Sequence, residues 1–232
     1  MPYIYEMIDA IKKYYDNLAP TYDSNRFENS YGKYIDQQER IFLRAILEKN
    51  SFKKKLDLGC GTGRFLEFAN HGVDISPKMI EIAQSKFPDV VIKEGSVSNI
   101  PYPENYFDLI YSLHVIMHLD IKITEEFLVE SHKKLNLNGK LIFDFPSKKR
   151  RKLINYKSTN WHAANDFSLA EIQKMTENNW KLKNYKGILF FPIHRFPTWI
   201  RPFFGKIDNF LCNSFLKEYA SYIIVELEKK CI

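Results

Sequence analysis

The chain has 232 residues, of which 45% are hydrophobic and 27% charged, and it contains only 9 Gly and 10 Pro. This composition excludes collagen-like, low-complexity and wholly disordered proteins, and the length fits one large domain. The 34 Lys and Arg residues exceed the 28 Asp and Glu residues, so the net charge is +6. Such a balance mildly favours anionic partners without identifying them.

Neither a membrane span nor a disulfide framework is expected. No stretch approaches the roughly 18 uncharged apolar residues of a span, and the start lacks the basic and then apolar order of a signal peptide. We therefore expect a cytoplasmic protein. The cysteines are Cys60, Cys212 and Cys231, which are far apart and form no Cys-x-x-Cys pair. This spacing indicates neither disulfides nor a metal site.

The first 50 residues are expected to be helical. One amphipathic stripe runs from Ile8 to Leu18 and is ended by Pro20, and a longer one runs from Tyr34 to Leu47. A polar and aromatic joint at 21–27 separates them. We interpret 1–50 as a helical region that precedes the core.

From residue 51 onward, short apolar runs alternate with amphipathic stretches, which predicts repeated βα units and a parallel sheet. We expect helices at 64–69, from Ser76 onward with Pro77 at its first position, and at 124–135. The expected strands lie at 55–58, 72–75, 90–92, 107–111 and 141–145. Residues 51–146 are therefore predicted to form a doubly wound α/β core.

The remainder, 147–232, has a weaker pattern. A charge run at 148–152 precedes an expected helix at 168–178, capped by Ser168, and a strand at 180–191. The stretch 191–204 is rich in Pro, aromatic residues and Arg, so we expect an irregular loop or cap there. A final strand near 219–227 is expected to pair antiparallel to its neighbour.

The most informative segment is Leu56-Asp-Leu-Gly-Cys-Gly-Thr-Gly. Alternating glycines directly after a buried strand let a ligand lie against bare backbone amides. The segment differs from a dinucleotide fingerprint, because Arg64 stands where a glycine is needed, and no Gly-Lys-Ser or Gly-Lys-Thr phosphate loop is present. The carboxylate of Asp57 suits an ammonium or sulfonium partner better than a phosphate. We therefore expect a partly cationic ligand.

At these residues the sequence resembles the class I S-adenosylmethionine-dependent methyltransferases, over about residues 14–145. The resemblance continues in four further blocks, which begin at Gly72, Ile100, His114 and Leu137. It implies a single domain with a Rossmann-like, mostly parallel sheet whose last strand is antiparallel. Residues 1–50 would form a helical lid, 51–146 the cofactor-binding core, and 147–232 the substrate cap and final strands.

The resemblance also implies the cofactor, S-adenosyl-L-methionine, with S-adenosyl-L-homocysteine as product. Gly59, Gly61 and Gly63 would line it, and Asp57 would lie near its methionine amino group. These roles agree with the physical reading of the glycine loop.

Four positions beyond the glycine loop complete the implied cofactor site. Asp74 would accept both ribose hydroxyls, while Ile75 would pack on the adenine. Ser96 stands where the family usually has an acid, and the Val97 amide would donate to the adenine ring. Ser112 would present its backbone to the cofactor at the end of a strand.

In the lid, Tyr22 either covers the sulfonium by cation-π contact or only packs the first helix on the sheet. Arg26 would meet the methionine carboxylate. Methyl transfer from a sulfonium is an in-line displacement, and a base helps when the acceptor is a hydroxyl. His118 is the candidate base, assisted by Tyr22, although a histidine there often only hydrogen-bonds a loop. His114 is left as a possible substrate contact.

Three readings of the function remain. The leading one is transfer to an O or N of a small molecule, with an acidic group on the acceptor suggested by Trp161-His162, His194-Arg195 and Arg201. An RNA or tRNA methyltransferase is favoured by the net charge and the charge run at 148–152. A subunit that binds the cofactor without catalysis is favoured by Ser96 and by a shortened second βα unit. The oligomeric state is not indicated.

Overall fold

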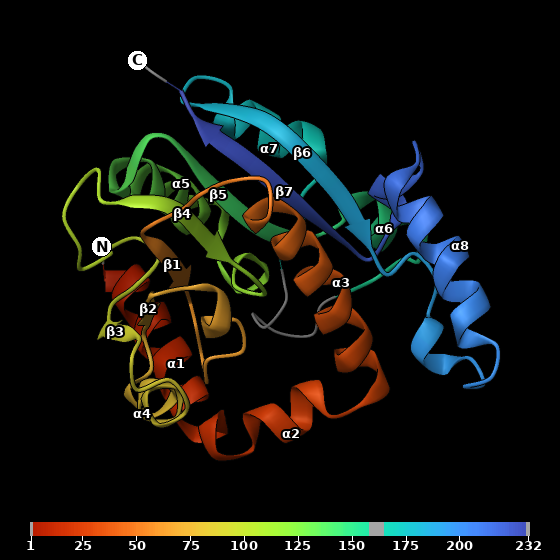
Figure 1. Cartoon of the computed structure of the whole chain (residues 1–232), viewed down its shortest axis with the longest axis horizontal. Coiled ribbons are helices and arrows are strands. Elements are labelled where there is room, and N and C mark those ends of the chain that lie inside the picture. Colours follow the sequence, from red (N-terminus) through yellow and green to blue (C-terminus); the bar gives the residue numbers. More distant parts are fainter. Residues whose placement is uncertain (1, 158–164, 231–232) are drawn as a thin grey trace.

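The computed structural model describes residues 2–157 and 165–230. A seven-stranded sheet has the order β3-β2-β1-β4-β5-β7-β6 (Figure 1). Strands β1 to β5 pair in parallel, whereas β7 runs antiparallel to both β5 and β6. The bounds are β1 Lys55–Leu58, β2 His71–Asp74, β3 Val91–Glu94, β4 Phe107–Ser112, β5 Leu135–Pro146, β6 Trp180–Ile188 and β7 Tyr222–Lys229. The predicted Rossmann-like fold, with its antiparallel last strand, is confirmed.

Apolar side chains cover both faces of the sheet, because successive residues of a strand point to opposite sides. Ile110 and Phe143 join the cluster that includes α5 (Ile121–Lys134) and α7 (Leu169–Thr176). Their neighbours Leu109 and Ile142 join a second cluster with α3 (Ser30–Leu47). Figure 1 shows α3 in front of the sheet and α5 behind it. The N-terminal helices are thus part of the core layer structure.

The helix expected at 64–69 is absent, and this prediction was wrong. The segment forms only a short 3-10 turn at Leu66–Phe68 before β2 begins at His71. A crossover between parallel strands needs about a dozen residues or more to carry a helix back along the sheet. The glycine loop uses much of that length, and α3 covers this face of the sheet instead.

A second prediction was wrong at 201–204, which belongs to a helix. Helix α8 spans Arg201–Asn213 and has Pro202 in its first turn. Proline there is favourable because its missing N–H has no helical partner at that position. The charge run forms α6 (Lys148–Leu153), which is capped by Ser147. The predicted cap of α7 is confirmed, because Ser168 forms a capping box with Glu171.

The predicted helices of the first 50 residues are confirmed as α1 (Pro2–Leu18), α2 (Tyr22–Phe27) and α3. Acidic residues fasten them to the core. Asp16 accepts from the Ser76 hydroxyl, and Asp23 accepts from the Thr62 hydroxyl at 2.5 Å. The helices therefore lie closed over the glycine loop and over the start of α4 (Pro77–Lys86). No helix in the described ranges has the length and apolar character needed to cross a membrane.

Candidate functional site

A first hollow opens at the carboxyl ends of β1, β2 and β4, under residues of α1 and α2. Ligands of open α/β sheets bind at this edge, where loops leave the strands. Most of the residues expected to bind a cofactor meet here. Those that line the first hollow are Tyr22, Gly59, Gly61, Asp74, Ile75, Ser96 and Val97.

The glycine loop presents bare backbone to this hollow. Gly59 and Gly61 have φ angles of +79° and +52°, which side chains rarely adopt. A Cβ on Gly59 would lie 2.5 Å from a methyl group of Val115. The loop is fixed to β2, because the N–H groups of Gly59 and Cys60 both donate to the Val73 carbonyl, at 2.7 and 3.0 Å. The sequence therefore needs glycine at 59 for both conformation and space.

Gly63 and Ser112 are not among the residues that line the hollow. Gly63 has a φ of +91°, and a Cβ there would lie 3.0 Å from the ring of Phe87. Its role is thus to shape the loop and to pack it on α4. Ser112 is fully buried at the end of β4, and its hydroxyl has no hydrogen-bond partner among the described residues.

Asp57 lies directly before the glycine loop and is 3% exposed. Its Oδ2 finds no hydrogen-bond partner in the described part of the chain. Burial raises the pKa of Asp57 well above its usual value, and the nearby carboxylate of Asp74 raises it further. A buried carboxyl oxygen without a partner is costly. A cationic ligand group close to Asp57 would remove this cost.

Asp74 joins the glycine loop to the turn after β2. One carboxyl oxygen accepts from the Gly61 N–H at 2.7 Å, and the other accepts from the Ser76 N–H at 2.9 Å. Burial raises the pKa of Asp74, although these backbone donors oppose the change. Because each carboxylate oxygen has two lone pairs, Asp74 retains acceptor capacity toward the hollow that it lines.

A second hollow adjoins the first and encloses about 500 Å³, including space open to solvent. Tyr15, Tyr22, His114 and His118 line both hollows. Arg26 lines the second hollow and not the first. The site therefore has two compartments that meet at a wall of tyrosine and histidine side chains.

A sequence model described as a methyltransferase domain matches residues 56–143. These residues include the glycine loop, β2, β4 and most of β5, which carry the first hollow. Residues 56–143 therefore form a methyltransferase domain.

Two curated relatives agree with this assignment. An uncharacterised methyltransferase of Anoxybacillus flavithermus is 31% identical and aligns with 56% of this chain and 64% of its own length. The phosphoethanolamine N-methyltransferase of Plasmodium falciparum is 28% identical, over 43% of this chain and 41% of its own length. The chain thus spans less than two thirds of the length of each of these relatives.

A solved structure extends the likeness of the fold. It is an S-adenosylmethionine-dependent methyltransferase of Thermotoga maritima, described as a possible histamine N-methyltransferase. The two chains are 20% identical, with a TM-score of 0.68 and coverage of 93% of this chain and 98% of that one. The likeness of the fold thus extends over most of the chain and beyond 56–143.

In this methyltransferase the ring of Tyr15 packs against His118, with centroids 6.1 Å apart. Tyr15 also contacts Tyr22, at 6.2 Å. Burial raises the pKa of both tyrosines, so their hydroxyls stay protonated at neutral pH. The sequence placed Tyr15 in the apolar stripe of the first helix, but did not pair it with His118, since that contact joins α1 to the loop after β4.

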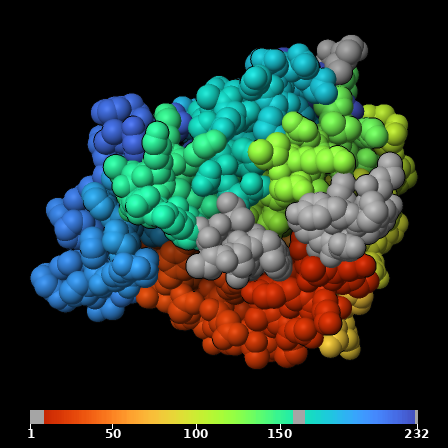
Figure 2. Space-filling model, turned by 180° about the vertical axis from the view of Figure 1, so that it is seen from behind, coloured from red at the N-terminus to blue at the C-terminus, as the bar shows by residue number. Residues whose placement is uncertain are grey.

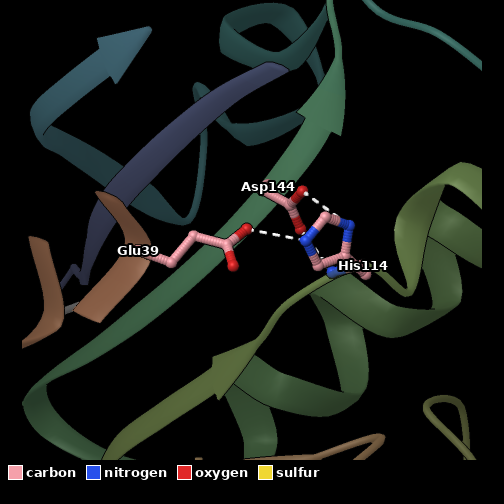
Figure 3. A group of neighbouring side chains, drawn as sticks. All are labelled: Glu39, His114 and Asp144. Atoms are coloured by element: carbon pink, nitrogen blue, oxygen red, sulfur yellow. Dashed lines mark hydrogen bonds and ion pairs between the residues drawn. The ribbon is translucent and has the colours of Figure 1, made fainter. Parts of the chain in front are cut away.

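His114 lies between two buried carboxyl groups (Figure 3). Its Nε2 is 2.8 Å from Glu39 Oε1, and its Nδ1 is 3.8 Å from Asp144 Oδ2. The backbone N–H of His114 also donates to Asp144 at 2.6 Å. Because each ring nitrogen faces a different carboxyl group, this arrangement resembles an ion pair more than a metal site.

The charges within this cluster shift the pKa of each of its three side chains. Burial alone would lower the pKa of His114, but the carboxylates of Glu39 and Asp144 outweigh it and raise the pKa. Burial would raise the pKa of Glu39, yet His114 and Arg64 lower it. Burial raises the pKa of Asp144 to about 6. The two carboxylates therefore favour the imidazolium form of His114, which makes it a poorer base than a histidine without such partners.

Sequence reasoning missed the Glu39–His114–Asp144 cluster, because its members come from α3, the loop after β4, and β5. No local spacing connects them. Other residues were expected to line the acceptor pocket, and none of them is found in either hollow among the described residues. Trp161 and His162 lie outside the described residues. His194 and Arg201 line a groove between α3 and α8 and do not line either hollow.

Proposed function

We propose that this methyltransferase moves a methyl group from S-adenosylmethionine to an oxygen or nitrogen of a small molecule that carries an acidic group. The observation that carries the proposal is the pair of hollows that share Tyr15, Tyr22, His114 and His118 as a common wall. Alignment of donor and acceptor in a site that excludes water supplies much of the acceleration in such displacements.

The residues of the first hollow and the adjacent Asp57 fit the cofactor. Asp57 does not line the hollow, but its unpartnered Oδ2 favours a cationic amino group, and Gly59 leaves backbone uncovered for close approach. Asp74 offers its remaining lone pairs to hydroxyl groups, while Ile75 offers an apolar surface. When bound, S-adenosylmethionine supplies an electrophilic methyl group on a sulfonium.

The second hollow supports an acidic acceptor. Arg26 lines it, and no Asp or Glu is among its described lining residues. Oppositely charged groups in a partly buried site attract more strongly than in water. We propose that Arg26 binds the acidic group of the acceptor, which replaces its expected contact with the cofactor.

His118 is the proposed general base for an acceptor hydroxyl, because it lies on the common wall. Tyr15 packs edge-on against its ring and holds the imidazole toward the boundary. Tyr22 packs against Tyr15 and would cover the reacting centre. An acceptor amine that is already neutral would need these residues for position rather than for proton removal.

The charge run supports a small molecule over RNA. Lys148 pairs with Glu171, Lys149 pairs with Glu218 at 3.0 Å, and Arg151 lies 3.6 Å from a nearby Asp carboxylate. Phosphate binding relies on clustered cations that are available to the nucleic acid. These side chains are already partnered by carboxylates of the chain.

The first test is calorimetric titration of S-adenosylmethionine and S-adenosylhomocysteine into wild type, Asp74→Ala and Asp89→Ala, the last an exposed control. We expect saturable binding that Asp74→Ala weakens about tenfold or more and Asp89→Ala leaves unchanged. Absence of binding by folded wild type would contradict the cofactor assignment.

The second test is transfer of labelled methyl groups to small acids that carry a hydroxyl or amine, with His118→Asn as the comparison. We expect the variant to keep cofactor affinity and to lower kcat with hydroxyl acceptors by about 100-fold. Binding without turnover on any acceptor would favour the reading as a non-catalytic subunit. Turnover only on RNA, lost at high salt, would favour an RNA methyltransferase.

A further inference from the structure

Helix α8 exposes large aromatic side chains to solvent. Phe203 is 64% exposed and Phe210 is 71% exposed, while Trp199, just before the helix, is 83% exposed. Residues four and seven positions apart lie on the same face of a helix. Phe203 and Phe210 therefore share one face of α8, and we call this face, together with the exposed Trp199 that precedes the helix, the α8 stripe. A contiguous exposed apolar surface of this kind marks an interaction site.

The stripe is not needed to hold α8 on the protein. The opposite face of the helix carries the buried residues Asp208 and Cys212. Asp208 accepts from the Tyr34 hydroxyl at 2.8 Å and from the Phe191 N–H at 2.7 Å. These contacts fix α8 on α3 and on the segment after β6. The helix thus has one face that anchors it and a second apolar face with no partner among the described residues.

The surroundings of the stripe are cationic. Lys206 lies between Phe203 and Phe210 in the sequence and is exposed. With Lys33 and Arg201 it lines a groove between α3 and α8 that has no Asp or Glu among its described lining residues. The acid of α8, Asp208, is buried and points inward. Figures 1 and 2 show α8 as a projection at one edge of the molecule.

We propose that the α8 stripe docks this protein on a bilayer surface rich in anionic lipids. Helices that lie in a membrane interface present Trp and Phe to the acyl boundary and Lys or Arg to the headgroups. A second copy of this chain fits less well, because a twofold contact would bring equivalent patches together and place Lys206 near its own equivalent. Charge complementarity therefore favours lipid over self-association.

Docking there would lie close to the acceptor side of the site. The ring of His194, in the segment that leads into α8, packs on Tyr31 with centroids 4.8 Å apart. Tyr31 lines the second hollow. The docking surface and this hollow are thus connected through one packed aromatic contact. The proposal itself does not depend on methyl transfer.

The test is sedimentation of the full chain with vesicles of phosphatidylcholine, with and without phosphatidylglycerol. The chain has 3 Trp, and Trp180 is buried, so a Trp161→Phe background makes the emission shift report on Trp199. Phe203→Ser is compared with Leu137→Ser, a control with 60% exposure on β5. Lys206→Glu is compared with Lys181→Glu, an exposed position on β6.

We expect binding to the anionic vesicles, with a blue shift of the emission. Phe203→Ser should weaken binding about tenfold or more, and Lys206→Glu about fivefold or more, while both controls match wild type. Failure to sediment, or equal binding by Phe203→Ser and Leu137→Ser, would refute the proposal. A lipid-independent dimer that Phe203→Ser dissociates would also refute it and would assign the stripe to an interface between copies.

Discussion

Replacement of Asp144 by Asn probes the buried cluster that lies behind both hollows. Asp144 is 1% exposed and holds the backbone N–H of His114, which has a φ of +60°. Asn keeps an oxygen acceptor for this N–H and removes the ionisable group. The variant should therefore fold in the same way and lose only the charge and its titration.

The raised pKa of Asp144 gives the sign and the size of its effect on stability as the pH changes. Burial raises the pKa of Asp144 from 3.8 to about 6. A carboxyl with a raised pKa binds its proton more tightly in the folded state, so its contribution to stability is present below 3.8 and is lost as the pH rises through about 6. At about 1.4 kcal/mol per pKa unit, this loss is about 3 kcal/mol. Asp144→Asn has no ionisable group at this position, so it should not lose stability in this way as the pH rises.

The assay is urea unfolding of wild type, Asp144→Asn and the exposed control Asp89→Asn at a series of pH values from about 4 to about 7. The free energy of unfolding of Asp144→Asn, relative to wild type, should increase by about 2 kcal/mol across this range, because part of the contribution is already lost at pH 4. The difference between Asp89→Asn and wild type should stay constant. Parallel curves for Asp144→Asn and wild type would refute the assignment of a buried, mostly protonated Asp144 at acidic pH.

Further predictions concern three single positions. Arg26→Ala should raise the KM for an acidic acceptor about tenfold and leave the affinity for S-adenosylmethionine unchanged in calorimetry, because Arg26 lines only the second hollow; an equal loss of cofactor affinity would contradict this. Gly59→Ala should destabilise the protein by about 1–3 kcal/mol in urea unfolding, since its Cβ would meet Val115 at 2.5 Å, and Val115→Ala should recover part of the loss. Burial opposes ionisation of Asp108, but the hydrogen bonds from the Lys54 N–H and the Asn136 amide outweigh burial and lower the pKa of Asp108. The stability that ionised Asp108 contributes is therefore lost as the pH falls, and Asp108→Asn should flatten the acid limb of the curve of unfolding free energy against pH. An unchanged acid limb would refute this role.

The sequence predicted the order of strands and the place of the cofactor loop because these depend on local patterns. Short apolar runs define β1 to β5, and glycines after a buried strand define a loop that only glycine can form. Asp74 ends β2 and Ile75 follows it, and both line the first hollow. Asp108, near the start of β4, accepts from the N–H groups of Lys53 and Lys54, both at 2.9 Å, and so fixes the chain that leads into β1.

Where the sequence was wrong, tertiary packing outweighed local pattern. The helix expected at 64–69 gave way to α3, which packs on the same face from a distant part of the chain. Arg26, which was expected to contact the cofactor, lies in α2 and lines the second hollow, so its expected role stays a prediction. Gly63 shares the glycine pattern but packs against Phe87.

The sequence by itself indicated the methyltransferase resemblance, the succession of core strands along the chain and the glycine loop, since each follows from residues that are adjacent in the chain. The tertiary structure alone decided that Glu39, His114 and Asp144 form one buried cluster, that Tyr15 meets His118, and that α8 keeps an exposed aromatic face. Such features depend on which distant surfaces bury one another. Periodicity identifies an apolar face, but it does not specify what that face contacts.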